Sequence, residues 1–255
     1  ASYGELGNDQ VFYNGRLQEY AFLSTFGFGQ YPIDGRVVET LYETVLPNPN
    51  FTWEVARNTN IGLDTKLFNR LNLTLEYFDN QRDRILIQQQ GSTPDSSGIS
   101  RLLPPTNFGS MENTGYEFNI AYNGGDSNYS NPDAFRYTIG VNGGYSKNEI
   151  IFIDEVSGAP EWQLREGKPL GAYLLYETDG VFFDQSEIDA NTVDYSQVTP
   201  QLKPGDLRLV DYDGNGLIDG DDQVRQEDAF TPRLQFGITL DMSYKNFAEF
   251  QSFPI

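Results

Sequence analysis

Residues 211–222 carry oxygen-bearing side chains at the spacing of a calcium-binding loop. Such twelve-residue loops take ligands from positions 1, 3, 5, 9 and 12, a backbone carbonyl from position 7, and a sharp turn from Gly at position 6. Gly216 stands at position 6. The spacing therefore predicts a calcium site whose ligands are Asp211, Asp213, Asn215, Leu217 through its carbonyl, Asp219 and Asp222.

The same twelve residues also suit a loop that holds no metal. Asp and Asn side chains accept hydrogen bonds from backbone amides two residues further on, and Gly supplies positive φ. Asp222 has a shorter reach than the Glu usual at position 12, and no amphipathic helix pair flanks the loop. From the residues alone, a calcium loop and a set of self-bonded turns both remain open.

Composition excludes several other kinds of chemistry. The chain has no Cys and no His, so it offers no thiolate site, no Ser-His-Asp arrangement and few routes to zinc. Its net charge of −20 argues against a nucleic acid partner, because phosphates are bound by surplus Lys and Arg. A glycoside hydrolase with paired carboxylates needs no His, but nothing in the sequence fixes two carboxylates at a defined separation. We therefore expect a protein that is not an enzyme.

The loop must be positioned by the elements around it, and the clearest of these is a long alternating strand at 234–244. One face carries Leu234, Phe236, Ile238, Leu240, Met242 and Tyr244, and the other carries Gln235, Gly237, Thr239, Asp241 and Ser243. Strands in soluble proteins usually have about five or six residues, whereas a tilted membrane-spanning strand needs roughly nine to eleven. The length therefore favours a strand that crosses a membrane.

Alternation recurs at 60–67, 71–77, 116–123 and 137–146, always with a small, hydrophilic second face. No apolar run approaches the roughly eighteen residues of a membrane helix. The pattern predicts an all-β fold, an antiparallel transmembrane β-barrel segment with its apolar face toward lipid. A soluble β-sandwich with the apolar face inward would show the same period. The long segments 88–112, 154–171 and 184–206 are expected to be acidic extracellular loops.

In such a barrel the polar strand faces would line the lumen or contact a plug. The residues expected there are Asp64, Glu76, Glu117, Asn119, Thr138, Asn142 and Asp241. The aromatic residues Trp162, Tyr173 and Phe182 fall in or beside the long segments. They could stack on sugar faces or pin the loops to one another.

Several blocks, in order, resemble the C-terminal part of the barrel of SusC/RagA-type TonB-dependent outer-membrane transporters. They are residues 1–8, PNPNFTWE at 47–54, 59–64, NFGSMENTGYE at 107–117, EGKPLG at 166–171, YETDGVF at 176–182, and 205–206 with DYDGNGLIDGDD at 211–222. Their order over nearly the whole chain makes the resemblance more specific than any block alone.

The resemblance implies a plugged barrel of about 22 strands, of which this chain would supply fewer than half. We expect residues 1–255 to be a partial barrel domain that lacks the plug, the amino-terminal region and the last strands. It implies import of large nutrients, oligosaccharide or peptide, across the outer membrane of a Gram-negative bacterium. The implied partners are a SusD-like surface lipoprotein, TonB through the missing amino-terminal region, and outer-membrane lipid. Trp162, Tyr173 and Phe182 could then pack against the lipoprotein.

Two features of the termini fit a fragment. The start has neither the basic nor the apolar region of a signal peptide, and the end falls within an expected strand at 247–255.

The alternative from another class is a secreted, calcium-stabilised β-sandwich that binds glycans or mediates adhesion. It would share the aromatic residues and the acidic loop but would fold in water.

Overall fold

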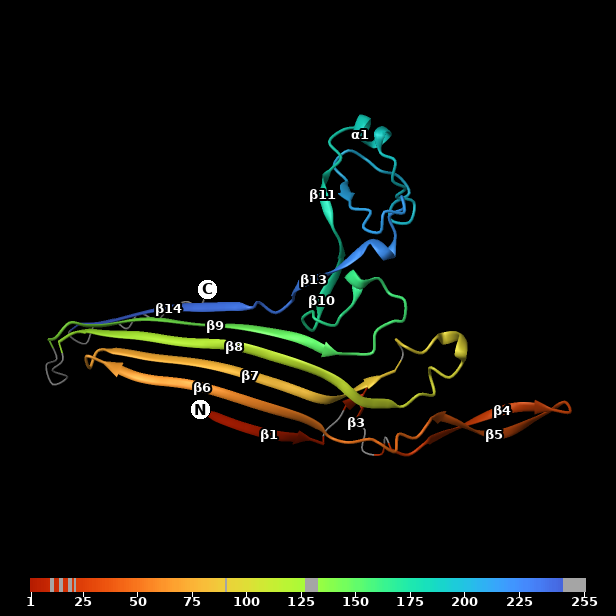
Figure 1. Cartoon of the computed structure of the whole chain (residues 1–255), viewed down its shortest axis with the longest axis horizontal. Helices are drawn as coiled ribbons and strands as arrows, with labels where there is room; N and C mark the ends of the chain where they lie inside the picture. Colours follow the sequence, from red (N-terminus) through yellow and green to blue (C-terminus); the bar gives the residue numbers. More distant parts are fainter. Residues whose placement is uncertain are drawn as a thin grey trace.

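The computed structural model describes residues 1–9, 12–13, 16–17, 20, 22–89, 91–126 and 133–244. The end segment 247–255, expected from the sequence to be a strand, lies outside the described residues. Figure 1 shows a long, gently curved sheet, with a hairpin and a lobe extending from one of its ends. In the described part of the chain, no helix has both the length and the apolar character needed to cross a membrane.

The sheet is an antiparallel arrangement of six strands in the order β1-β6-β7-β8-β9-β14. The bounds are β1 (Ser2–Asn8), β6 (Glu54–Leu67), β7 (Leu71–Gln88), β8 (Pro105–Gly125), β9 (Arg136–Phe152) and β14 (Leu234–Ser243). The four central strands have 14, 18, 21 and 17 residues. They exceed the roughly nine to eleven residues that span a bilayer, so in a membrane part of each strand would lie beyond the apolar layer.

The two ends of this sheet differ in their connections (Figure 1). At the turn end, β6 joins β7 through Phe68 and Asn69, both at positive φ, and the Arg70 N–H donates to the Leu67 carbonyl over 3.0 Å. Positive φ at both central residues is the mark of a type I′ hairpin turn, whose twist matches that of the strands. At the loop end, the segments 89–104 and 153–233 make the long connections.

Register places the apolar residues of five strands on one face, as the alternation predicted. Their cross-strand rows are Ile61–Tyr77–Tyr116–Tyr145–Leu234, Leu63–Leu75–Phe118–Gly143–Phe236, Thr65–Leu73–Ile120–Val141–Ile238 and Leu67–Leu71–Tyr122–Ile139–Leu240. Most of these side chains are exposed; Ile238, for example, is 49% exposed. A soluble sandwich would cover this face with a second sheet, and the described residues provide none.

Tyrosines border this apolar face on both sides. Tyr145 lies in the row nearest the loop end, beside Tyr116 with ring centroids 5.4 Å apart, and Tyr137 lies near the turn end beside Tyr122. Eight residues of one strand separate Tyr137 from Tyr145, about 26 Å along the strand. At a tilt of 35–45° this spans about 20 Å along the membrane normal, close to the roughly 25 Å apolar band of outer-membrane barrels.

The opposite face is polar and closely packed, and Gly115 shows why it needs small residues. A Cβ added at Gly115 would lie 2.3 Å from the Tyr145 carbonyl oxygen and 2.5 Å from the Phe78 ring. Phe78 lies opposite Gly115 in the register and covers it. Elsewhere on this face space is less restricted: at Gly62 the nearest atom to an added Cβ is 3.7 Å away.

The remaining elements extend from the loop end (Figure 1). Short strands β2 (Phe12–Tyr13) and β3 (Arg16–Leu17) precede a hairpin of β4 (Thr25–Ile33) and β5 (Arg36–Val45). Single 3₁₀ turns lie at η1 (Asp95–Ser97) and η2 (Glu161–Gln163). The lobe contains β10 (Ala172–Tyr176), β11 (Thr178–Val181), α1 (Gln185–Ala190), β12 (Leu207–Leu209), η3 (Gly220–Asp222) and β13 (Gln223–Ala229). β10 pairs with β13, and β11 pairs with β12.

The lobe begins its only α-helix among the described residues at an N-cap. Asp184 accepts hydrogen bonds from the backbone N–H groups of Ser186 (2.8 Å) and Glu187 (3.1 Å). The Ser186 hydroxyl also donates to Asp184, and these bonds hold the pKa of that carboxyl below its ordinary value. The cap starts a helix of six residues in a segment where no periodic pattern predicts one.

Candidate functional site

The lobe that carries the acidic loop has a small apolar core. Phe182 (2% exposed), Tyr195 and Ile218 are buried there, with Ile188 and Leu209 packed against them. The Tyr195 hydroxyl accepts from the Leu209 N–H over 2.9 Å and donates to the Leu209 carbonyl over 3.2 Å. Burial is the main cause that raises the pKa of Tyr195. The core therefore holds β12 and the end of β11 against Ile218, which lies inside the acidic loop.

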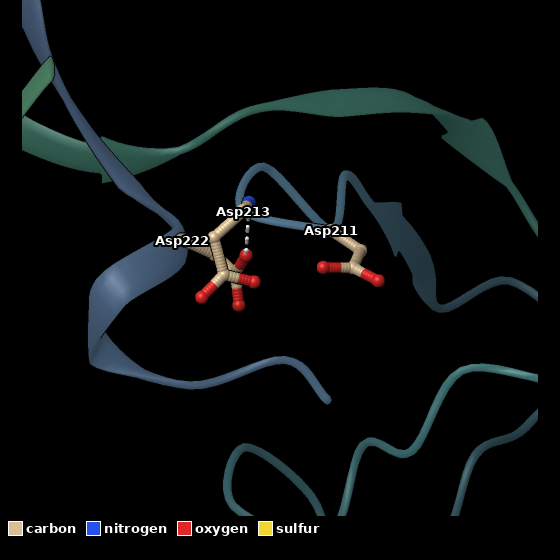
Figure 2. A group of neighbouring side chains, drawn as sticks. All are labelled: Asp211, Asp213 and Asp222. Carbon is tan, nitrogen blue, oxygen red and sulfur yellow. Dashed lines mark hydrogen bonds between the residues drawn. The ribbon is translucent and has the colours of Figure 1, made fainter. Parts of the chain in front are cut away.

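Three carboxylates converge within that loop (Figure 2). One oxygen from each of Asp211, Asp213 and Asp222 lies within 4.8 Å of the other two. Asp222 is fully buried, and it accepts from the N–H groups of Tyr212 (2.7 Å), Asp219 (2.9 Å) and, more weakly, Asp213 (3.4 Å). A carboxylate oxygen has two lone pairs, so an oxygen that accepts one N–H can still bind a cation.

The other sequence-predicted ligands have partners of their own. Asp219 caps η3 by accepting from the Asp221 N–H over 2.8 Å. The side-chain oxygen of Asn215 accepts from the Leu217 N–H (2.7 Å), while its NH₂ donates to Asp213. Leu217 forms a parallel bridge with Asp194. The structure thus brings Asp211, Asp213 and Asp222 together, and it uses Asn215 and Asp219 to shape the turns.

Asp211 also takes part in the self-bonded turns that the sequence allowed as an alternative to a metal site. Its two oxygens accept from the backbone N–H groups of Gly214 (2.8 Å), Asn215 (3.1 Å) and Gly216 (2.8 Å). Gly214 and Gly216 both have positive φ, as this folding of the loop requires. The donor set is hard oxygen on a tightly turned backbone, which fits Ca²⁺ in chemistry.

The three aromatic residues expected to contact substrate or partner take different positions. Trp162 donates from Nε1 to the Asp221 carbonyl (2.8 Å), and its ring lies 5.0 Å from that of Tyr212. Phe182 is in the lobe core and presents no face to a ligand. Trp162 and Phe182 therefore hold loop segments together, which is one of the three roles that the sequence allowed. Tyr173 is 44% exposed and remains open to a contact.

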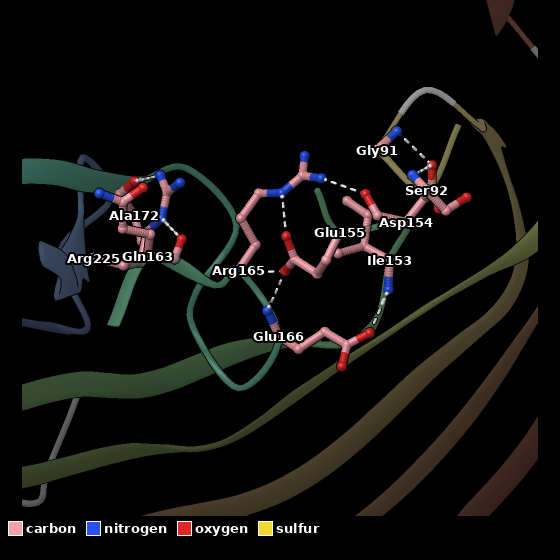
Figure 3. Close-up of polar contacts among 10 residues, drawn as sticks. All are labelled: Gly91, Ser92, Ile153, Asp154, Glu155, Gln163, Arg165, Glu166, Ala172 and Arg225. Carbon is pink, nitrogen blue, oxygen red and sulfur yellow. Dashed lines mark hydrogen bonds and ion pairs between the residues drawn. The ribbon is translucent and has the colours of Figure 1, made fainter. Parts of the chain in front are cut away.

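A second polar region lies where the loops meet the sheet, and sequence reasoning did not find it (Figure 3). Asp154 accepts from the N–H groups of Gly91 (2.7 Å) and Ser92 (3.1 Å), which joins the end of β9 to the β7–β8 connection. Burial pushes the pKa of Asp154 upward, but the hydrogen bonds from Ser92 and Gly91 and the charge of Arg165 outweigh it, so the pKa lies below its ordinary value.

Glu155 and Arg165 continue this region toward the lobe (Figure 3). Glu155 accepts from the backbone N–H groups of Arg165 (2.5 Å) and Glu166 (2.9 Å), and the Arg165 guanidinium donates to the Asp154 carbonyl (2.8 Å). A cavity of about 950 Å³ adjoins these residues. Asp154 and Gly91 lie 63 positions apart and Glu155 and Arg165 ten, and these residues share no period, so no local signal marks them.

The residues expected in the lumen lie on the polar face, as predicted. Asp64 accepts from the Thr74 hydroxyl (2.8 Å) and the Thr138 hydroxyl donates to Asn123 (2.9 Å) across neighbouring strands. Glu76 lies opposite Glu117, Asn119 opposite Asn142, and Asp241 opposite Thr138. A cavity of about 870 Å³ is lined by residues of β7, β8, β9 and β14, among them Glu76, Glu117 and Asn142, and by the segment before β14.

Comparison with known proteins agrees with this architecture. The chain is 30% identical over 260 aligned residues to TonB-dependent receptor P3 and 28% identical over 210 residues to TonB-dependent receptor P26, both from Formosa agariphila. These alignments cover 97% and 78% of this chain but 24% and 20% of the relatives, so the chain spans about a quarter or less of their length.

Solved structures of similar fold include the RagAB peptide importer in its open-open and closed-closed states, each with a TM-score of 0.61 and 22% identity. The match covers 95% of this chain and 24% of the solved one. The family described as TonB dependent receptor-like, beta-barrel, matches residues 2–247. The sheet with its exposed apolar face is therefore barrel wall of an outer-membrane protein of a Gram-negative bacterium, and the chain belongs to the TonB-dependent receptor β-barrel family.

Proposed function

We propose that the protein to which this chain belongs imports a large polar nutrient, an oligosaccharide or a peptide, through the outer membrane with energy from TonB. The observation that carries the proposal is the two-faced sheet: in-register apolar rows bordered by tyrosines on one side, and small polar residues on the other. A wall of this kind separates lipid from an aqueous interior. The name of the similar RagAB importer adds peptides as one substrate class.

In this proposal the chain is part of a larger plugged barrel. Strands β1 and β14 each have one unpaired edge among the described residues. Backbone groups at an open edge cannot be satisfied in lipid, so further strands would have to close the wall. The plug and the segment that contacts TonB would belong to the rest of the protein.

A SusD-like surface lipoprotein is the partner that we propose for the loop end. The lobe and the β4–β5 hairpin extend there, and the hairpin exposes large apolar residues such as Phe28 (85% exposed) and Leu41 (61% exposed). A two-stranded hairpin with exposed apolar residues on its own is marginally stable in water. Contact with a lipoprotein that covers the mouth would shield these side chains.

We also propose that the loop 211–222 binds Ca²⁺ through Asp211, Asp213 and Asp222. The proposal rests on the convergence of three carboxylates around a buried Asp222. Titration of the full-length transporter with Ca²⁺ after chelator treatment, followed by calorimetry, tests it. An Asp213→Asn variant should weaken binding at least about tenfold, because one charged ligand is lost. No heat of binding for the unmodified protein at millimolar Ca²⁺ would leave the loop as self-bonded turns.

The import proposal is tested by uptake in cells that produce the full-length protein. Fluorescently labelled oligosaccharides and peptides are offered with and without TonB, and with and without the co-expressed lipoprotein. Uptake that requires TonB and is stimulated by the lipoprotein supports the proposal. Uptake of small solutes alone, with no dependence on TonB, would instead describe a passive channel.

A further inference from the structure

A third cavity, of about 320 Å³, lies at the loop end between β7, the start of β8 and the segment before β6. Its lining is made by Asn48, Asn50, Thr52, Arg84, Gln89, Thr106, Asn107 and Phe108. The volume is at the small end of the range for ligand pockets, roughly 300–1,000 Å³, and suits a single sugar or amino-acid unit. The lining contains amides, hydroxyls and one guanidinium but no carboxylate, although the chain has 37 acidic residues.

Two asparagines build the frame of this cavity. Asn48 is 6% exposed; its NH₂ donates to the Pro105 carbonyl (2.8 Å) and its oxygen accepts from the Asn50 N–H (3.1 Å). Asn107 exchanges hydrogen bonds with both backbone groups of Thr52, accepting over 3.0 Å and donating over 2.8 Å. The frame is therefore fixed by hydrogen-bonded amides, one of them buried and the other half-buried.

Arg84 is held at the edge of this frame in a strained conformation. Its φ is +58°, in the left-handed region that non-glycine residues rarely adopt, and the register of β7 against β8 shifts between Arg82 and Ile85. The NH₂ of Asn107 donates to the Arg84 carbonyl (3.0 Å). Within the described part of the chain, the exposed Arg84 guanidinium has no ion pair or hydrogen bond. Residues with strained backbone often lie at functional sites, so Arg84 beside this cavity is a candidate contact for a ligand.

Thr106 supplies a second unused polar group. Its hydroxyl is buried and has no hydrogen-bond partner among the described residues. Buried polar groups without partners are uncommon, and one that lines a pocket suggests a partner that comes from outside the chain.

We propose that this cavity is a subsite for a carboxylate of the transported nutrient, with Arg84 as its charged contact and with Thr106 and the side-chain amides of Asn50 and Gln89 as hydrogen-bonding neighbours. The guanidinium presents parallel N–H groups that match the two oxygens of a carboxylate. This inference rests on the proposed import function and refines it to an acidic substrate. The carboxylate belongs either to a uronic acid unit or to the end of a peptide.

The test measures binding to the full-length transporter in detergent at about 150 mM salt by calorimetry. The probes are trigalacturonate, N-acetyl-trialanine with a free carboxylate, N-acetyl-trialanine amide and neutral maltotriose. The variants are Arg84→Gln, Arg84→Lys and the matched control Arg82→Gln, which makes the same charge change two residues away and outside the cavity lining. Thr106→Val removes the hydroxyl while keeping the shape.

Arg84→Gln is expected to weaken binding of one acidic probe about tenfold or more, since hydrogen bonds to charged groups are the strong ones. Arg84→Lys should recover part of the loss, and Arg82→Gln should have no effect. Thr106→Val should weaken binding without lowering the melting temperature. Loss for trigalacturonate alone identifies a uronide subsite, and loss for the free-carboxylate peptide alone identifies a peptide subsite.

Three results overturn the subsite: neither acidic probe binds, Arg84→Gln binds as well as the unmodified protein, or Arg82→Gln loses as much affinity. TonB-dependent uptake measured in cells with the same variants separates this outcome from failure of the import function. Uptake that persists in Arg84→Gln with unchanged affinity refutes the subsite and leaves import standing. Absence of TonB-dependent uptake in the unmodified protein refutes import itself.

Discussion

Replacing Asp222 with Ala should open the lobe while leaving the barrel wall intact. Asp222 is fully buried and accepts backbone N–H bonds of 2.7 Å from Tyr212 and 2.9 Å from Asp219, with a weaker one of 3.4 Å from Asp213. Ala cannot accept any of them. The N–H groups that remain have no alternative partner without water entering the loop.

The size of the effect follows from these contacts. A hydrogen bond to a charged group contributes about 1.5–3 kcal/mol, so the two short bonds together give about 3–6 kcal/mol, with the third left out of the sum. Whole domains are stable by about 5–15 kcal/mol, and the lobe has a core of only Phe182, Tyr195 and Ile218 with a few partly buried neighbours. The substitution should therefore remove most of the lobe's stability.

Hydrogen exchange on the full-length protein in detergent measures this directly. A loss of 3 kcal/mol corresponds to a more than hundredfold fall in protection in peptides that cover 176–195 and 211–222. Peptides from β7 and β8 serve as the internal reference and should not change. Asp221→Ala is the matched control, because Asp221 is an exposed neighbour with the same charge. Protection in Asp222→Ala within threefold of the unmodified protein would show that the N–H bonds to Asp222 are not what holds the lobe together.

Three further predictions concern the wall and its junction with the loops. Gly115→Ala should prevent or slow assembly of the barrel, because the added Cβ would lie 2.3 Å from a carbonyl oxygen, whereas Gly62→Ala should be tolerated. Heat-modifiable migration of the folded form on gels compares the two variants, and equal folding would refute the packing argument. Ile238→Arg on the apolar face should destabilise the protein in bilayers by about 2–4 kcal/mol and Thr239→Arg on the polar face by much less, as refolding into vesicles would measure; a reversed order would mean that the faces are assigned the wrong way round. Because the pKa of Asp154 is lowered in the folded state, the stabilisation that this carboxylate gives is fully present above the ordinary Asp pKa of about 3.9 and is lost as pH falls through the folded pKa. Exchange protection of the two amides bonded to Asp154 should therefore fall in that acidic window. In Asp154→Asn the protection of these amides should be lower already at neutral pH and nearly independent of pH.

The wall could be predicted from the sequence because lipid imposes a strict period on it. Every second residue from Leu234 to Met242 has to be apolar, and the register with β9 confirms the face of each. The type I′ turn at Phe68 and Asn69 also lies in the gap between the alternating segments 60–67 and 71–77. The period does not predict the pairing at the loop end of the strands, because the register shift between Arg82 and Ile85 changes which residues face each other.

The candidate sites were harder to predict because they are built from segments that share no period. The acidic loop could be recognised, since its ligands lie within twelve consecutive residues. The sequence could not show that Phe182 would be buried in the lobe core, because this burial depends on packing against Tyr195 and Ile218. Nor could it reveal the contact of Asp154 with Gly91, which joins residues 63 positions apart.

The lobe and the wall are therefore stabilised by different forces. The wall's apolar rows face outward, so it depends on the bilayer and on backbone pairing along long strands. The lobe lies beyond the tyrosine border and buries few large side chains. Its stability therefore depends on carboxylates that accept backbone N–H groups, above all Asp222. We expect the lobe to open without unfolding the wall, because the lobe core of Phe182, Tyr195 and Ile218 includes no residue of the sheet. It follows that variants of Asp222 should loosen the lobe at the loop end of the sheet while barrel assembly stays unchanged.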